Sequence, residues 1–314
     1  MKPVFAAVLL LASPVFATGD FTISQEKGTI TVKLDGKLFT EYRTDSRVPY
    51  LYPLVSASGA TLSRHWPMEK GFGEEEDHPH HRSFWLSHGA VNGHDFWAWT
   101  TKDSDPKIEH KGVKTAGPSM FAVNLAWTAA GKTQLNEERS YTFKQFDADT
   151  TAIIVTSRLT AADEDVTFGD TKEGMFAIRV DRSLRQKAPK GKDAKEAKGT
   201  IADSEGRKDG EVWGKKSKWV AFAGPDEKGE PAVIAMFDHP SNFRHPTWWH
   251  ARDYGLLAAN PFGVHDFEGK KDDPHAGDHV LKKGETLSFR YEVILHHGSL
   301  ESAKLADRWA DFSK

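Results

Sequence analysis

The sequence predicts an all-β protein, an antiparallel β-sandwich with a short C-terminal helix. Three observations support this prediction. Apolar and polar residues alternate over many short segments, turns rich in Gly, Asp and Asn separate these segments, and helical spacing is confined to the last residues of the chain. Short turns between many strands are typical of antiparallel sandwiches and barrels.

The alternating segments begin directly after residue 20. Turns at 27–28 and 35–36 divide residues 21–43 into successive strands. Further strands are expected at 50–54, 84–86, 95–99, 121–128, 134–146, 151–159, 166–168, 175–180, 218–223, 231–237 and 282–298. At the end of the chain Leu300, Leu305 and Trp309 form an apolar stripe, so we expect a helix that begins near Ser299.

Two parts of the chain depart from this pattern. Residues 1–17 read MKPVFAAVLLLASPVFA, which combines Lys2, a short apolar run and small residues near Ala17. This pattern predicts a cleaved signal peptide and a periplasmic or secreted protein. Residues 18–314 are expected to form one domain, interrupted at about 184–218 by a lysine-rich, solvated insertion that contains KAPKGKDAKEAKG.

The composition excludes several classes of protein. The net charge is -3, so nothing supports a nucleic-acid partner. The chain has no cysteine, which excludes disulfides, thiolate catalysis and iron–sulfur clusters. No segment after the leader is apolar enough to span a membrane, so no membrane association is expected once the leader is removed. The oligomeric state does not follow from the sequence.

Histidines and tryptophans are concentrated between Arg64 and Trp99. Within this stretch, DHPHHRSFW (77–85) has three interpretations. His81 and its neighbours can do acid–base work or contact substrate beside Arg82. Asp77, His78, His80 and His81 can instead bind zinc, iron or manganese, so a divalent metal is a possible cofactor. A hydrogen-bonded structural cluster is the third interpretation.

Three further segments carry candidate residues. In SHGAVNGHDFWAW (87–99), His88, Asn92 and Asp95 can contact hydroxyl groups, although a plain Asn-Gly hairpin explains part of this segment. In GDTKEGMFAIRV (169–180) a carboxylate lies beside a lysine, which is typical of a tuned base but also of a surface ion pair. In RHPTWWHARDYGLLAANPFG (244–263), at most one of the adjacent tryptophans can face a site, and core packing is the alternative.

These segments resemble a family of exported bacterial proteins of unknown function that is called PmoA-like, or "methane oxygenase PmoA". The matching stretches are YPLVSASGATLSRHWPM, DHPHHRSFWLSHGAVNGHDFW, GDTKEGMFAIRV, VWGKKSKWVAF and HPTWWHARDYGLLAANPFG. Methane oxygenase activity itself is not expected, because its subunits span membranes. The resemblance extends to galactose-mutarotase-like sandwiches, and it implies that fold and a carbohydrate substrate.

We therefore expect a carbohydrate-active enzyme, a hydrolase, lyase or epimerase, that uses histidine and glutamate acid–base chemistry. The expected catalytic residues are His81, His88, Glu173 and His250, with His81 or His88 as acid and Glu173 as base. The expected substrate-binding residues are Arg64, Arg82, Asn92, Asp95, Trp97, Lys172, Arg179, Trp248, Trp249, Arg252 and Tyr254. All are expected to converge on one cleft, because scattered burial of so many ionisable groups is costly. A metal-dependent enzyme centred on 77–81 and a non-catalytic carbohydrate-binding protein are the alternatives.

Overall fold

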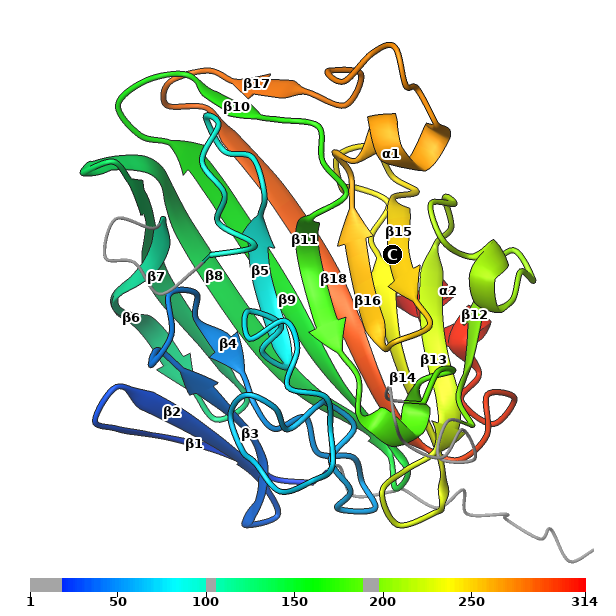
Figure 1. The fold of residues 1–314 in the computed structure, drawn as a ribbon. Coiled ribbons are helices and arrows are strands. Elements are labelled where there is room, and N and C mark those ends of the chain that lie inside the picture. Colours follow the sequence, from blue (N-terminus) through cyan, green and yellow to red (C-terminus); the bar gives the residue numbers. More distant parts are fainter. Residues whose placement is uncertain (1–18, 100–105, 189–197) are drawn as a thin grey trace, which may run out of the picture.

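The computed structural model describes residues 19–99, 106–188 and 198–314, which form two large antiparallel sheets packed against each other (Figure 1). The expected signal peptide lies outside the described residues. In Figure 1 the strands β5, β11, β16 and β15 lie in front of β9, β18 and β14. The prediction of an antiparallel β-sandwich is therefore confirmed.

Each large sheet has eight strands. The first contains, in spatial order, β1 (Phe21–Glu26), β2 (Thr29–Leu34), β3 (Lys37–Arg43), β4 (Tyr50–Leu51), β5 (Phe84–His88), β11 (Gly174–Arg179), β16 (Leu256–Asn260) and β15 (Trp248–Arg252). The second contains β12 (Thr200–Asp203), β13 (Trp219–Pro225), β14 (Pro231–Asp238), β18 (Thr286–His297), β9 (Thr150–Ala161), β8 (Lys132–Asp147), β7 (Met120–Ala129) and β6 (Lys107–Gly117). A small ribbon pairs β10 (Val166–Phe168) with β17 (His279–Leu281).

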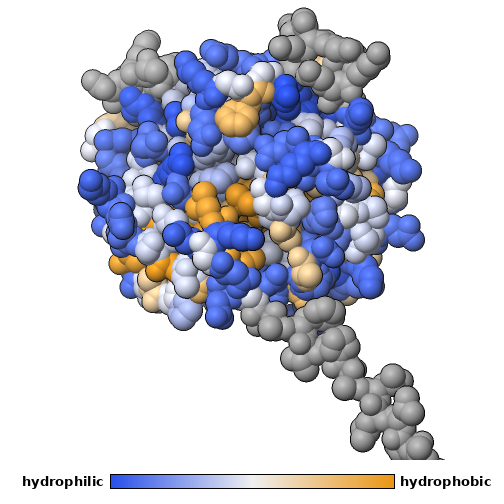
Figure 2. All heavy atoms as spheres, turned by 90° about the horizontal axis from the view of Figure 1, so that it is seen from below, coloured by the Kyte–Doolittle hydropathy of each residue, from blue (hydrophilic) through white to orange (hydrophobic). Residues whose placement is uncertain are grey.

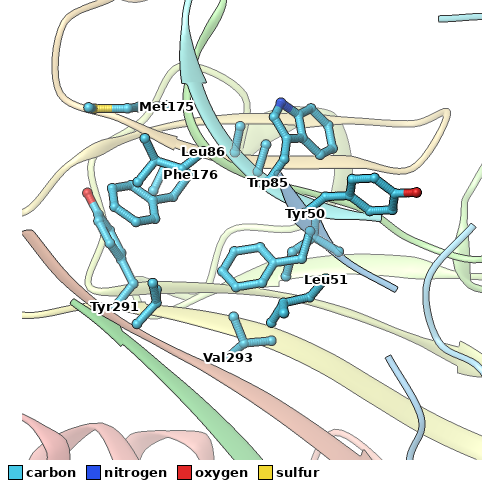
Figure 3. Packing of buried hydrophobic residues seen from close by; sticks show 14 of the residues in the cluster. Tyr50, Leu51, Trp85, Leu86, Met175, Phe176, Tyr291 and Val293 are labelled. Atoms are coloured by element: carbon cyan, nitrogen blue, oxygen red, sulfur yellow. The ribbon is translucent and has the colours of Figure 1, made fainter. Parts of the chain in front are cut away.

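Alternation along the strands builds the core between the sheets. Figure 3 shows Phe176 of β11 on the side of Tyr291 of β18, while Trp85 and Met175 lie on the opposite side of the first sheet. The Phe176 and Tyr291 rings are 4.3 Å apart between centroids. Since successive residues point to opposite faces, the first sheet presents a second face, away from the core, on which Trp85 lies.

The outer face of the second sheet is covered by α2 (Leu305–Phe312), and α1 (Val264–Glu268) lies near the start of β15 in Figure 1. The helix α2 begins later than expected. Ser299 is not its cap; the Ser299 hydroxyl accepts a hydrogen bond from the backbone N–H of Ser302 in a turn that precedes the helix.

No helix within the described ranges is long and apolar enough to cross a lipid bilayer. Figure 2 shows a mostly hydrophilic end of the molecule with one hydrophobic area near its middle.

Other boundaries also differ from expectation. The strand predicted at 95–99 is wrong: Asp95 Oδ1 accepts the N–H groups of Trp97 and Ala98, which makes a tight turn. The insertion expected at 184–218 is not a single excursion, because β12 pairs with β13 as the edge of the second sheet. Residues 189–197 of its lysine-rich part lie outside the described residues.

Glu292 of β18 makes stability depend on pH. Its side chain is buried on the α2 side of the second sheet, and burial raises the pKa of Glu292 to about 7. The folded state therefore holds the proton of the Glu292 carboxyl group more tightly than the unfolded chain does. The stability that this proton contributes is complete at acidic pH and is lost as pH rises toward 7. We expect Glu292→Gln to raise the free energy of unfolding at pH 8 by about 2 kcal/mol and to change it little at pH 4, as measured by urea denaturation. A variant equally stabilised at both pH values would contradict this.

Candidate functional site

The outer face of the first sheet carries a row of side chains that belongs to four strands. Trp85 pairs with Ala177, Ala177 with Ala258, and Ala258 with His250, so these four side chains share one face. Arg179 lies two residues beyond Ala177 on the same face. The row therefore has large rings at its two ends and two methyl groups between them, and all five residues are buried. Loops of the chain cover this face and bring polar groups onto it.

Asp77 connects three basic side chains above this row. Its Oδ1 accepts hydrogen bonds from Arg64 Nη1 and, at 3.4 Å, from Arg179 Nη2. Its Oδ2 accepts a hydrogen bond from His78 Nδ1 at 2.7 Å. Burial alone would raise the pKa of Asp77, but the bond from His78 and the charges of Arg179 and Arg64 outweigh it and hold the pKa well below its usual range. Asp77 is therefore an ionised carboxylate that orients the imidazole of His78.

Arg64 fixes the loop that carries this carboxylate. Its buried Nη2 donates to the backbone oxygens of Asp77 at 3.1 Å and of His78 at 3.0 Å. His78 has a left-handed backbone conformation with φ 43°, which costs free energy for a residue other than glycine. The hydrogen bonds from Arg64 hold the loop in that conformation, so Arg64 is a positioning residue and not a contact for substrate.

His81 lies beneath His78 in a stack of rings. The His81 ring lies 4.7 Å from the His78 ring and 5.1 Å from the Trp85 ring, and Trp97 meets its edge at 5.6 Å. Arg179 Nη1 donates to His81 Nδ1 at 3.0 Å, which assigns the proton to Nε2. Burial first, and then the charge of Arg179, hold the pKa of His81 well below its usual value. His81 is therefore neutral at pH 7, and its buried, neutral ring does not favour the role of acid that was expected for His81 or His88.

Glu173 and Lys172 lie on the accessible rim of the same face. Lys172 Nζ is 3.8 Å from Glu173 Oε1 and 3.8 Å from Asp266 Oδ1. Burial raises the pKa of Glu173, the charge of Lys172 opposes this, and Asp95 raises it further. His250 Nδ1 donates to the backbone oxygen of Lys172 at 2.9 Å, and burial lowers the pKa of His250 to about 4. His250 thus positions the Lys172–Glu173 segment as a neutral ring, in place of the catalytic role expected for it.

Tyr254 joins the histidine stack to the basic residues. Its ring is stacked with that of His78, with centroids 5.8 Å apart, and lies 4.6 Å from the guanidinium carbon of Arg179. Arg252 approaches the Tyr254 ring at 5.8 Å and the Trp213 ring at 5.9 Å. Burial raises the pKa of Tyr254, while Arg179 and Arg252 lower it and Glu173 raises it. The charges of Glu173 and Arg179 therefore act on one phenol, and the convergence of the four segments on one cleft stays a prediction.

His88 does not belong to this site. It shares a face of β5 with Phe84 and Leu86, is fully buried, and packs against Phe168 and Phe262. Its Nε2 donates to the backbone oxygen of Gly169 at 2.9 Å, and burial lowers its pKa to about 4. The expected acid–base pair of His88 and Glu173 is wrong, because Glu173 lies on the solvent side and His88 on the core side of the strands.

Two residues that were expected to contact substrate, Asn92 and Trp249, also have structural roles. Asn92 Oδ1 accepts the N–H of Thr167 and its Nδ2 donates to Gln134 Oε1, so Asn92 connects its turn to β10 and β8. Trp249 lies in the core with its Nε1 bonded to the Ser217 backbone oxygen, while Trp248, on the opposite face, packs with Trp213 and Phe267 and lies under Lys216. Only one of the adjacent tryptophans is on the site face, as alternation requires.

The cluster at 77–81 is a poor fit for a metal ion. Both oxygens of Asp77 accept hydrogen bonds from basic groups, and His81 Nδ1 accepts one from Arg179. Two buried guanidinium groups next to the cluster oppose a cation. Over the described ranges, no group of three or more histidine, aspartate or glutamate side chains is arranged to hold a metal.

His78, Trp85 and Trp213 belong to the site but were not among the expected catalytic or substrate-binding residues. His78 had a detectable signal, because it follows an aspartate directly and precedes a proline. Trp213 lies in a stretch, VWGKKSKWVAF, that carried the family resemblance without a role for any one residue. Its place beside Arg252 follows only from the tertiary structure.

Removal of the Asp77 charge should destabilise the fold. Asp77→Asn leaves Arg64 and Arg179 buried without their shared carboxylate, and loss of one partner of a buried ion pair costs about 3 kcal/mol. We expect the free energy of unfolding at pH 7 to fall by about this amount in chemical denaturation. Asp311→Asn, which removes an exposed pair with Lys314, is the control and should leave the free energy of unfolding nearly unchanged. Equal effects of the two substitutions would refute the role of Asp77.

No curated protein sequence is detectably similar to the chain. Among solved structures, heparan sulfate lyase HepC from Pedobacter heparinus has 10% sequence identity and a TM-score of 0.39; the match covers 91% of this chain, which spans 37% of the HepC chain. A galactose mutarotase related enzyme from Lactobacillus acidophilus has 11% identity and a TM-score of 0.28, and the match covers 89% of this chain and 98% of the other.

The expected family of unknown function is found, although its description makes no reference to methane oxygenase. The family is described as a "Family of unknown function (DUF6807)", and the match extends over residues 29–310. The chain belongs to the DUF6807 family.

Proposed function

We propose that this protein is a carbohydrate-active enzyme that transfers protons to and from a sugar through His78 and Glu173. The observation that carries the proposal is the accessible His78 ring, fixed by the ionised Asp77, together with the partly exposed Glu173 at the rim of the same face. The side chain of His78 is 44% exposed and that of Glu173 is 36% exposed. Both can therefore reach a bound molecule, unlike the buried His81, His88 and His250.

The arrangement supports acid–base chemistry. Asp77 occupies Nδ1 of His78, so Nε2 is the atom that exchanges a proton with a ligand. Glu173 has a raised pKa, as a carboxyl group needs if it is to exchange protons near neutral pH. A proton on His78 would also lower the pKa of Glu173.

The surroundings of this pair favour a sugar as substrate. Tyr254 and Trp213 present partly exposed rings, on which the apolar face of a sugar can stack. Arg252, Lys172 and Asp95 supply donors and acceptors for hydroxyl groups at the rim. Hydrolysis, elimination and epimerisation all need a proton donor and a base, and the site offers both. We propose that the enzyme acts in the periplasm or outside the cell.

The test is a screen of plant and algal oligosaccharides with mass analysis of products. Elimination leaves one product lighter than the hydrolysis product by one water, and epimerisation leaves the mass unchanged. The blank is a His78→Ala, Glu173→Gln double variant, which should make no product. The matched control is a His275→Ala, Glu268→Gln double variant, which removes an exposed Asp–His pair and an exposed Lys–Glu pair elsewhere. Binding without product by the wild-type protein would favour a non-catalytic carbohydrate-binding protein.

A further inference from the structure

A series of four rings leads away from the proposed catalytic pair. The Tyr254 and His78 rings are 5.8 Å apart, the His78 and His80 rings 5.7 Å, and the His80 and Trp99 rings 6.4 Å. Each of the four residues is exposed or partly exposed. Burial lowers the pKa of His80 to about 4, so this ring is neutral at pH 7. Neutral rings at intervals along a surface can each contact the apolar face of one sugar unit.

The series ends at a cavity of about 610 Å³. Trp99 and Arg82 line its near side, and the loop after β3 and the first residues of β6 line its far side. The backbone N–H of Ile108 in β6 donates to the backbone oxygen of Arg47 at 2.7 Å, which joins the edge strand of the second sheet to the loop between β3 and β4 of the first. The cavity is therefore formed by the framework of the sandwich and is continuous, through Trp99, with the ring series.

Arg82 is a cation in this cavity that pairs with no carboxylate in the part of the chain that the structure describes. Its guanidinium carbon lies 5.5 Å from the Tyr50 ring and 5.9 Å from the Trp99 ring. Its one hydrogen bond among the described residues goes from Nη1 to the Tyr50 hydroxyl at 3.5 Å, and its Nε has no partner there. The nearby Asp45 instead accepts a hydrogen bond from Tyr50 at 2.8 Å. A guanidinium that lies beside two rings and has no carboxylate partner among the described residues is suited to bind an anion.

We propose that the rings of Tyr254, His78, His80 and Trp99 and the cavity at Arg82 form an extended binding site for an oligosaccharide chain that carries anionic groups. Arg82 binds a carboxylate or sulfate of a sugar unit several positions away from the reacting unit. This inference rests on the proposed function, and it narrows the substrate from any sugar to an anionic chain. A single sugar at His78 and Glu173 would leave the Trp99 and Arg82 contacts unused.

Binding measurements separate this inference from catalysis. Calorimetric titration of the Glu173→Gln protein uses four probes: galacturonic acid, its hexamer, the methyl ester of that hexamer, and a mannuronate hexamer. We expect at least one of the two carboxylated hexamers to bind about tenfold or more tightly than the monomer and than the ester. Trp99→Ala should weaken the binding of the hexamer about tenfold and leave the affinity for the monomer unchanged. Arg82→Gln should remove the preference for the free carboxylate over the ester.

The controls are Phe146→Ala, which removes a ring with 39% exposure that lies under Arg308, and Arg158→Gln, which removes an exposed guanidinium of β9. Both should bind the hexamers as the parent protein does. Equal affinity for monomer and hexamers, absence of binding to either carboxylated hexamer, or hexamer binding unchanged by Trp99→Ala and Arg82→Gln would each overturn the inference. Length-dependent binding through Trp99 without product in the oligosaccharide screen would retain the extended site and refute the catalytic function.

Discussion

Replacement of His78 by alanine is expected to lower kcat/KM by between about 10² and 10⁴, the range that general acid–base groups contribute. The physical reason is the loss of an accessible imidazole whose Nδ1 is held by Asp77 at 2.7 Å. Steady-state kinetics on the substrate found in the screen give the measurement. His275→Ala is the matched control, since His275 is bonded to Asp278 at 2.9 Å on the surface, and it should leave kcat/KM unchanged.

A comparison of single and double variants distinguishes a catalytic His78 from a structural one. Asp77 acts on a ligand only through His78, so Asp77→Asn should lower kcat/KM in the wild-type background and change it little in the His78→Ala background. Unfolding curves must show that the variants are folded at the assay temperature, because Asp77→Asn is also destabilising. Additive losses of activity from the two substitutions would mean that the Asp77–His78 pair does not work as a unit.

The fold was largely predictable because most strands carry their own alternation. The long strands β7, β8, β9 and β18 were located within a few residues. The hairpin of β15 and β16 was not predicted as strands, since its aromatic and alanine-rich sequence pairs through tertiary context and its alternation is weak. Asp95 has a side chain that caps a turn, and this local chemistry overrode the aromatic pattern that had predicted a strand.

The site was predictable as a group of segments but not as a set of roles. Alternation within β5 already places His88 with Phe84 and Leu86 on the core face, so its exclusion could have been derived from the sequence. The choice of His78 over His81 could not, because it depends on burial and on the hydrogen bond from Arg179. Nothing local to DHPHH indicates that Arg64 and Arg179 share its aspartate, since Arg179 lies on a distant strand.

Glu173→Gln should abolish most of the activity without loss of stability. We expect kcat/KM to fall by between about 10² and 10⁴, because the amide keeps the shape of the side chain but cannot exchange a proton. Burial raises the pKa of Glu173, so the folded state favours the protonated form; any stabilisation this gives is present at low pH and is lost as pH rises through the raised pKa. At pH 7 a neutral amide should therefore not destabilise the fold, and thermal unfolding should show a midpoint at or above that of the wild type.

The pH dependence of the wild type identifies the role of Glu173 directly. If Glu173 is the base, kcat/KM should rise with pH along an acidic limb that lies above the ordinary glutamate pKa of about 4.3, because the carboxylate must be ionised and its pKa is raised. The residual activity of Glu173→Gln should lack this limb. Glu268→Gln, which removes a carboxylate 3.2 Å from Lys270 and of similar exposure, should keep both the rate and the limb. A limb that persists unchanged in Glu173→Gln would assign the base to another residue, and Asp95, another carboxylate at the rim, would be the next group to replace.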